Sequence, residues 1–354
     1  MNSSVIRAYT TNNRKQVTSL VAQWPFKPLA RHHVWSASNL FDLAAQRVMK
    51  TLENENGAAW VMIEGSQARG FAAFSMLPWD SEQLGVTAAR LDYLIAEGSV
   101  KEQQQTKKAL LACVLEHAEV RGVRHLSVRV DASDLSSLHV LERSGFITVD
   151  GILTFALDLA AHQPAARTHN FKIRLANAAD ADAAAALART AYVHDRFHCD
   201  PAISRERADE LHATWLRNSC NGRAADAVVL AEDQTGLLGF VTCSVQRDTA
   251  ESLGRLVGTI VLVASAERAR GLGVGFAATM AALEWFRQQG CEIVEVGTQL
   301  RNIPASRLYQ KCGFRMVGSS LSLRRLLLPI LSKDWSARGQ IRLPGANYAN
   351  NDAN

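Results

Sequence analysis

The sequence lacks any long apolar run, which argues against a membrane-spanning helix. No stretch approaches the roughly 20 apolar residues that cross a bilayer. The first 16 residues, MNSSVIRAYTTNNRKQ, also lack the apolar core of a signal peptide. We therefore expect a cytoplasmic protein without a membrane partner.

The sequence is also poor in cysteine patterns. Its six cysteines are scattered, with no C-x-x-C pair and no His/Cys cluster at metal-ligand spacing. None has a His or Asn partner that the sequence implies for a nucleophile. We expect reduced thiols, no metal site and no covalent enzyme intermediate.

Runs of one charge are missing as well. The formal net charge is +5, but no run of five or more Lys/Arg occurs, and acidic and basic residues interleave. This pattern argues against nucleic acid as a partner. The mild positive excess favours small anionic molecules such as phosphates.

The chain is long enough for two domains, and its halves look related. Each half ends with a helical segment, a strand-like run, a polar turn, a short helix and a Gly-Phe pair, Gly145-Phe146 or Gly313-Phe314. We predict a tandem α/β duplication with a mixed sheet in each half. The predicted parts are a domain at 1–160, a linker at 161–172, a catalytic domain at 173–337 and a tail at 338–354.

A glycine-rich turn, RARGLGVG at 268–275, joins a predicted strand at 254–265 to a helical segment at 276–290. A helix that starts directly after a strand presents free N–H groups and a positive dipole end, and glycines let an anion approach them. The turn is neither a Walker loop nor a G-x-G-x-x-G fingerprint. It predicts an anion site; tight packing is the alternative reading of the glycines.

A second pattern occupies 302–314, NIPASRLYQKCGF. Asn302 is placed to cap the helix that Pro304 opens, and Tyr309 lies on the same face two turns on. Tyr309 is either a functional residue near the sheet opening or part of the core.

Together the two patterns resemble the GNAT family of CoA-dependent N-acyltransferases, over most of residues 171–328. The R-x-x-G-x-G/A loop of that family is matched by Arg270, Gly271, Leu272, Gly273, Val274 and Gly275. The resemblance implies tandem GNAT folds, each a mixed, mostly antiparallel twisted sheet flanked by helices. It also implies a splayed central strand pair in the catalytic half.

The resemblance further implies a coenzyme A thioester, acetyl-CoA or a short acyl-CoA, as cofactor. The loop and Arg268 would hold its pyrophosphate, while Asn302 and Ser306 would bind nearer the pantetheine. Leu262, Val263 and Ala264 would line the pantetheine, and one of their amides would polarise the thioester carbonyl. In VASAERARG, the strand and the arginine of the loop are a couple of residues further apart than is usual in the family, so the residue that supplies this amide is defined only to within one or two positions. Tyr309 would protonate the leaving thiolate, with Asn302 also counted as catalytic.

The first half lacks these features. Its segment 97–108 has a single glycine and carries Glu97 and Glu102, which would repel a pyrophosphate. When the two halves are aligned on their Gly-Phe pairs, Leu141 occupies the position of Tyr309, and Asp134 occupies the position of Asn302. We expect a domain without a cofactor site that serves packing, dimerisation or acceptor binding, with segments 23–35 and 77–85 as candidates for the last role.

The segment 190–218 opens the catalytic half, and there the chain resembles GNAT members that acylate nucleotide-linked amino sugars, of the dTDP-4-amino-4,6-dideoxygalactose acetyltransferase type. The residues that carry this resemblance are Trp79, Asp80, Gly85, Arg196, Phe197, Pro201, Trp215 and Asn218. Arg196 is suited to bind the pyrophosphate of a sugar nucleotide, and the ring of Phe197 or Trp215 is suited to stack on its nucleobase. His194 and His198 suit hydroxyls, and either is a candidate general base. Phe197 and Trp215 are equally compatible with a helix core.

The leading hypothesis is therefore an N-acyltransferase acting on a dTDP- or UDP-linked amino sugar by direct attack in a ternary complex. The alternatives are a GNAT acting on an antibiotic amine or a peptide N-terminus, and a non-catalytic acyl-CoA-binding module. The family-level expectation is a homodimer. The acyl group and the sugar stay open.

Overall fold

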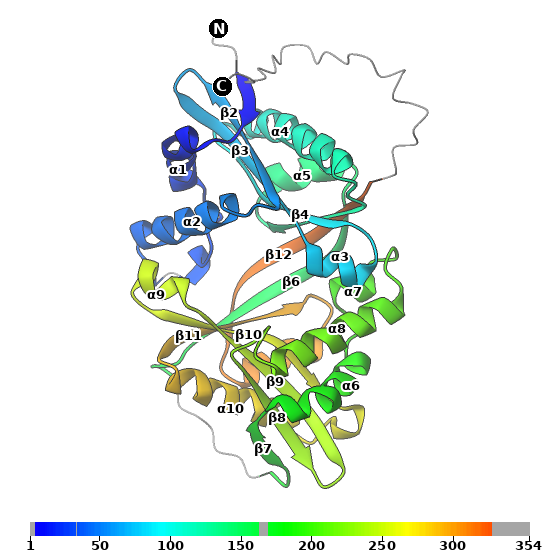
Figure 1. Cartoon of the computed structure of the whole chain (residues 1–354). Helices are drawn as coiled ribbons and strands as arrows, with labels where there is room; N and C mark the ends of the chain where they lie inside the picture. The colour runs from blue at the N-terminus through cyan, green and yellow to red at the C-terminus, as the bar shows by residue number, and fades with distance from the viewer. Residues whose placement is uncertain (1–3, 33, 163–168, 328–354) are drawn as a thin grey trace. The chain divides into compact units, whose positions relative to one another are not determined.

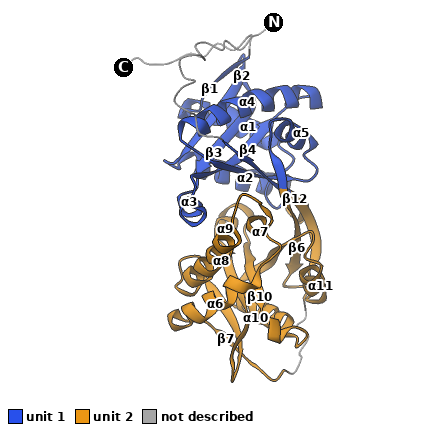
Figure 2. Cartoon of the chain, turned by 90° about the vertical axis from the view of Figure 1, so that its right-hand side faces the viewer, with its two compact units in different colours: residues 1–30, 36–148, 321–354 blue, residues 31–35, 149–320 orange. Residues whose placement is uncertain are grey.

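The computed structural model describes residues 4–32, 34–162 and 169–327 (Figure 1). The chain divides into two compact units, which Figure 2 colours separately. Unit 1 comprises residues 1–30, 36–148 and 321–354, and unit 2 comprises residues 31–35 and 149–320.

Unit 1 contains a sheet with the strand order β1-β2-β3-β4-β5. Neighbouring strands are antiparallel except β4 and β5, which are parallel. Its strands are β1 (Val5–Ala8), β2 (Gly57–Glu64), β3 (Gln67–Met76), β4 (Ala88–Ala96) and β5 (His125–Asp131). Its helices are α1 (Arg14–Gln23), α2 (Ala37–Leu52), α3 (Pro78–Leu84), α4 (Val100–Val120) and α5 (Leu135–Arg143).

Unit 2 contains a sheet with the order β6-β11-β10-β9-β8-β7. All neighbours are antiparallel except β10 and β11. Its strands are β6 (Ile147–Asp158), β7 (Lys172–Leu175), β8 (Ala227–Asp233), β9 (Gly236–Gln246), β10 (Leu256–Ser265) and β11 (Cys291–Gln299). Its helices are α6 (Ala181–Ala191), α7 (Arg196–Cys199), α8 (Arg205–Cys220), α9 (Asp248–Leu253), α10 (Val274–Gln288) and α11 (Ile303–Lys311).

Helices cover both faces of the unit 2 sheet. Phe276 and Phe286 of α10 pack with Ile260 and Val294 on one face. On the other face, α6 and α8 pack on residues of β8, β9 and β10, among them Phe240. The sheet between the two helix layers thus buries the apolar sides of both.

The two repeats exchange their last strands. Strand β6 ends the first repeat in sequence, yet from Val149 it belongs to unit 2 and pairs with β11, from Asp158↔Ile293 to Ile152↔Gln299. Strand β12 (Arg315–Leu326) ends the second repeat, and its last part, from Leu321, belongs to unit 1. There Leu323 joins the apolar core that α4 and α5 form with the sheet.

The predicted mixed, mostly antiparallel sheets flanked by helices are confirmed in both units. The predicted boundaries 1–160, 161–172 and 173–337 divide the chain by repeat, whereas the compact units divide it by packing, because of the exchanged strands. The predicted tail at 338–354 lies outside the described residues.

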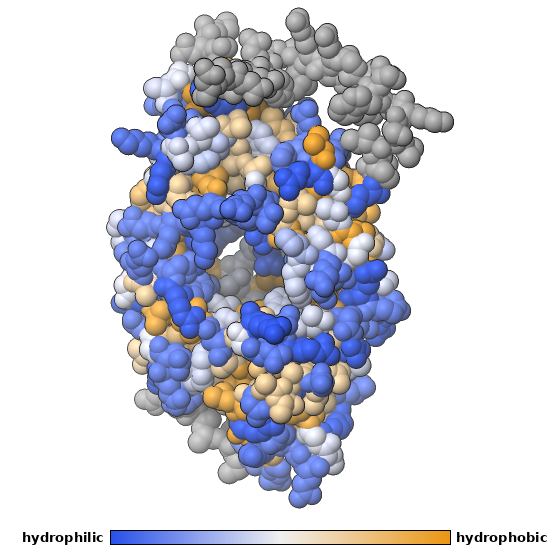
Figure 3. Space-filling view, in the orientation of Figure 1, coloured by the Kyte–Doolittle hydropathy of each residue, from blue (hydrophilic) through white to orange (hydrophobic). Residues whose placement is uncertain are grey.

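None of the described helices combines the length and the apolar character needed to cross a membrane. Hydrophilic residues cover much of the visible surface of the described chain, with apolar residues between them (Figure 3).

Candidate active site

The glycine-rich turn forms an open loop at the start of α10. Gly273 is the N-cap residue and has φ 80°, and Gly271 has φ 82°, both in the left-handed region that favours glycine. A Cβ atom at either position would meet no described heavy atom within 4 Å, and Leu272 between them is 61% exposed. Tight packing therefore does not explain these two glycines. It does explain Gly275, where a Cβ atom would lie 3.1 Å from Leu308.

The N-terminus of α10 has the character of an anion site. Its N-cap residue, Gly273, has no side chain that could cap the first amides. Free N–H groups and the helix dipole together attract negative charge. Arg268 and Arg270 flank the loop, paired at its surface with Asp233 at 2.9 Å and Glu267 at 3.1 Å. The Arg270–Glu267 pair is exposed and therefore weak, so Arg270 is free to turn toward a bound anion, whereas Arg268 is held by both oxygens of Asp233 and by the carbonyl of Leu237.

Strand β10 separates from β11 after Ile260, within the strand that leads to this loop. Their parallel ladder runs from Leu256↔Cys291 to Ile260↔Val296, and beyond it β10 continues beside β9 as far as Ser265. The register with β9 shifts between Ile260 and Val263, and the amide of Leu262 donates to Thr242 Oγ1 at 2.8 Å. The splayed strand pair expected in the catalytic half is thus confirmed. The Leu262 amide is engaged, and the Ala264 amide also faces β9, because Ala264 pairs with Phe240 and the next amide on that side, Ala266, donates to the carbonyl of Leu238. The amide of Val263 is therefore left as the candidate for polarising a carbonyl.

The second sequence pattern also folds as its residues suggest. Asn302 is the N-cap of α11 and accepts a hydrogen bond from the amide of Ala305 at 3.2 Å. Ser306 donates to the carbonyl of Asn302 at 3.3 Å. Tyr309 is 3% exposed, and burial raises the pKa of its phenol well above the usual range. The phenol therefore keeps its proton, which a general acid needs.

In the first repeat, the helix that corresponds to α10 is α4, and its N-terminus is capped by side chains of the chain itself. The carboxylate of Glu102 accepts a hydrogen bond from the amide of Ser99 at 2.7 Å, in a capping box at the N-terminus of α4. The helix thus carries its own anion where α10 has none. Leu141 is fully buried in the core, and Asp134 caps α5 while pairing with the buried Lys107 at 3.0 Å.

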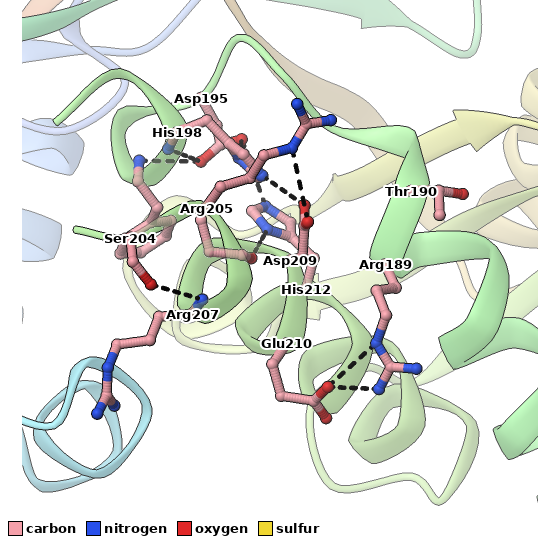
Figure 4. Close-up of polar contacts among 12 residues, drawn as sticks. Arg189, Thr190, Asp195, His198, Ser204, Arg205, Arg207, Asp209, Glu210 and His212 are labelled. Atoms are coloured by element: carbon pink, nitrogen blue, oxygen red, sulfur yellow. Dashed lines mark hydrogen bonds and ion pairs between the residues drawn. The ribbon is translucent and has the colours of Figure 1, made fainter. Parts of the chain in front are cut away.

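The segment that follows α6 and the helix α8 together form a largely buried polar cluster (Figure 4). Asp195 is the N-cap of α7, and its Oδ1 accepts from the amide of Phe197 at 2.9 Å. His198 lies between two carboxylates, with Nδ1 2.5 Å from Asp195 Oδ2 and Nε2 2.9 Å from Asp209 Oδ1. Burial opposes protonation of His198, but the hydrogen bonds to both carboxylates outweigh it and raise the pKa of the imidazole.

The other residues proposed for the acceptor lie around this cluster. Phe197 is only 5% exposed, and the guanidinium of Arg196 lies 4.4 Å from the centre of its ring. Trp215 is half-buried and stacks on His212 at 6.4 Å. The backbone carbonyl of His194 accepts a hydrogen bond from the thiol of Cys199 at 3.3 Å. Phe197 thus contributes to the core, and the polar surface here comes from Arg196 and His194.

Sequence reasoning missed Asp195, Asp209 and His212. Asp195 and His198 at i and i+3 carry a local signal, since an Asp before a short helix is a typical N-cap. His212 sits in the middle of an amphipathic helix, where nothing in the sequence distinguishes it from a core residue.

The six cysteines are free thiols, as expected. Burial raises the pKa of Cys220 and of Cys291, each to about 11. Such thiols stay protonated at neutral pH and are poor nucleophiles.

The comparisons with known proteins agree with this geometry. Residues 189–314 match the Acetyltransferase (GNAT) family, and residues 6–147 match an Acetyltransferase (GNAT) domain. The chain therefore belongs to the GNAT acetyltransferases, as a tandem of two GNAT domains, and is an acyl-CoA-dependent N-acyltransferase.

Two curated relatives show which proteins the chain is similar to. It is 26% identical over 254 residues to the spore coat polysaccharide biosynthesis protein SpsD of Bacillus subtilis, which covers 72% of this chain and 82% of the relative. It is 24% identical over 201 residues to the dTDP-fucosamine acetyltransferase of Escherichia coli O6:H1, and this match covers 56% of this chain and 81% of the relative. A GCN5-related N-acetyltransferase structure from Sphaerobacter thermophilus superposes with a TM-score of 0.60 at 16% identity, covering 91% of this chain and 95% of that one.

Proposed function

We propose that the chain transfers an acetyl group from acetyl-CoA to the amino group of a nucleotide-linked amino sugar, at a site in unit 2. The observation that carries this proposal is the glycine-lined start of α10, whose N-cap residue has no capping side chain and which follows the part of β10 that no longer pairs with β11.

The residues around that point fit acetyl-CoA. The amides at the start of α10, with Arg268 and Arg270, suit a pyrophosphate. Val263, Ala264, Asn302 and Ser306 would bind along the pantetheine. Bound acetyl-CoA supplies an acyl group activated as a thioester.

Tyr309 is the proposed general acid for the departing sulfur. Its buried ring and raised pKa support this role, because a phenol that keeps its proton can give it to a thiolate. The amine attacks directly, since the buried thiols offer no nucleophile. His194 is our candidate base, because both ring nitrogens of His198 are already engaged by carboxylates.

The acceptor class rests on two kinds of support. One similar protein is named a dTDP-fucosamine acetyltransferase and another acts in polysaccharide biosynthesis. In addition, the segment 190–218 carries Arg196, Arg205 and Arg207, whose guanidinium groups are suited to contacts with the phosphates of a nucleotide-linked acceptor.

The test is release of free thiol from acetyl-CoA with a panel of dTDP- and UDP-linked amino sugars, beside an aminoglycoside and a peptide. Turnover on a nucleotide sugar alone is the expected result. Turnover only on the aminoglycoside or the peptide would overturn the acceptor class. Absence of turnover with all acceptors, while acetyl-CoA still binds, would favour a binding module.

A further inference from the structure

Three metal-ligating side chains converge within the proposed acceptor segment, 190–218. Asp195, His198 and His212 each offer one ligand atom, and these atoms all lie within 4.8 Å of one another. The sequence spacing had predicted no metal site. The fold creates the cluster by packing α7 against the middle of α8 (Figure 4).

Both imidazoles are oriented from outside the cluster. His198 points Nε2 at Asp209 Oδ1, 2.9 Å away, and His212 points Nδ1 at the carbonyl of Ala208, 2.8 Å away. Metal-bound histidines almost always use their second ring nitrogen in this way, toward a carboxylate or a backbone carbonyl. The remaining nitrogens, His198 Nδ1 and His212 Nε2, both face Asp195 Oδ2.

The contact between His212 and Asp195 lacks a bridging proton. The Ala208 carbonyl can only accept a hydrogen bond, so Nδ1 of His212 carries the ring proton. With the ring proton on Nδ1, the neutral imidazole has its lone pair on Nε2. This lone pair lies 3.8 Å from a carboxylate oxygen, and both side chains are buried. Two buried acceptors that face each other call for a cation between them.

A fourth side chain packs against the cluster. The ring of Tyr192 stacks on His212, with centroids 4.2 Å apart, and its hydroxyl interacts electrostatically with Tyr309 and, to a smaller extent, with Asp195. This hydroxyl is buried and has no hydrogen-bond partner among the described residues. Such orphaned groups are rare, and a water held by an ion would satisfy this one.

We propose that Asp195, His198 and His212 bind one Zn²⁺ ion, with a water at the fourth position near the Tyr192 hydroxyl. Two imidazoles and one carboxylate are a common three-ligand set for zinc with an open position. The ion takes the place of the proton between His198 Nδ1 and Asp195 Oδ2. Asp209 and the Ala208 carbonyl act from behind the ligands, and Arg205, 3.8 Å from Asp209, limits the negative charge.

The test uses the full-length chain without an affinity tag, purified without chelator. We expect about one zinc per chain by elemental analysis. The apo protein should give tetrahedral d–d absorption bands on titration with Co²⁺. Zinc should also raise the midpoint of thermal unfolding.

Two ligand variants and two comparison variants sharpen the result. His212→Phe keeps the ring that stacks on Tyr192, and Asp195→Asn keeps the cap of α7; both should lose the bound zinc and the Co²⁺ bands. Asp209→Asn should weaken binding by about 10- to 100-fold. His139→Gln removes an exposed histidine of α5 and should change nothing.

Two outcomes would overturn the proposal. One is a wild-type chain that holds no metal, shows only the spectrum of hydrated Co²⁺ and gains no stability from zinc. The other is equal zinc binding by the wild-type chain and by His212→Phe, which would assign the metal to exposed histidines. Either result would make the cluster a hydrogen-bonded network that is held by the His198 proton.

Discussion

The ring of Phe155 lies 6.0 Å from the ring of Tyr309, although Phe155 belongs to the first repeat in sequence and Tyr309 to the second. Strand β6 makes this contact by joining the unit 2 sheet beside β11. Phe314 packs on Tyr309 at 5.9 Å as well, so two rings fix the position of the proposed acid.

This contact predicts the effect of Phe155→Ala. Loss of a fully buried phenylalanine should cost about 3–5 kcal/mol of unfolding free energy. It should also lower kcat by up to about 100-fold, because a displaced acid protonates poorly. Thermal unfolding and steady-state kinetics measure the two effects. Phe74→Ala, in the core of unit 1, is the matched control and should destabilise the chain while leaving kcat intact below its melting temperature. Equal kcat losses in both variants would argue against a positioning role.

The acid role itself predicts that Tyr309→Phe lowers kcat by roughly 100-fold or more. Because burial raises the pKa of Tyr309, the phenol keeps its proton at every pH below that raised value. Loss of the phenolic proton should therefore not reduce wild-type kcat as the pH rises toward the ordinary phenol pKa of about 10. Tyr93→Phe is the control, since burial also raises the pKa of Tyr93 but it lies in unit 1. Unchanged turnover in Tyr309→Phe would remove this residue from the mechanism.

The helix start of α10 predicts a separation of stability from cofactor affinity. Gly273 and Gly290 have φ 80° and 77° and lie at opposite ends of α10. An alanine at either position should cost about 1–2 kcal/mol of unfolding free energy, because L-residues are strained there. Only Gly273→Ala should raise the KM for acetyl-CoA, by about tenfold, the equivalent of one charge-assisted hydrogen bond. A similar rise in Gly290→Ala would attribute the effect to general destabilisation.

These local features could be predicted from the sequence because each depends on neighbours in the chain. Asn302 caps the helix that Pro304 opens. Gly271 and Gly273 follow a strand that is indicated by the apolar run at 258–265. The strand exchange could not be predicted, since nothing in β6 tells whether it pairs within its own repeat or with β11. The Asp195, His198 and His212 cluster was missed for the same reason, because it forms only when α7 packs on α8.

The first repeat predicts a single cofactor site per chain. Glu102 already neutralises the start of α4, and the buried Lys107–Asp134 pair stands where the second repeat has Asn302 alone. Isothermal titration with acetyl-CoA should therefore give one site per chain. Gly273→Ala should weaken that site without revealing another. A stoichiometry of two would mean that the first repeat has kept a cofactor site.

The edge of the unit 2 sheet predicts an acid-sensitive contribution to stability. Arg174 of β7 binds Asp180 and Glu232, each at 2.7 Å. Its hydrogen bonds lower the pKa of both carboxyl groups. Because the pKa values of both carboxyl groups are lower in the folded chain, these ion pairs stabilise it fully above the pKa values of the unfolded chain, about 3.9 for Asp and 4.3 for Glu. This stabilisation is lost as the pH falls through the pKa values of the folded chain.

Arg174→Gln should therefore cost about 1–2 kcal/mol at neutral pH, a value reduced by solvent screening. The difference from the wild-type chain should shrink below about pH 4, where the carboxylates become protonated. Urea unfolding at a series of pH values measures this. Arg189→Gln is the control, because its pair with Glu210 is about half exposed and should contribute less than about 0.5 kcal/mol. A difference for Arg174→Gln that stays constant from pH 7 to about pH 3 would show that packing of the β7 edge, and not the two carboxylates, sets its cost.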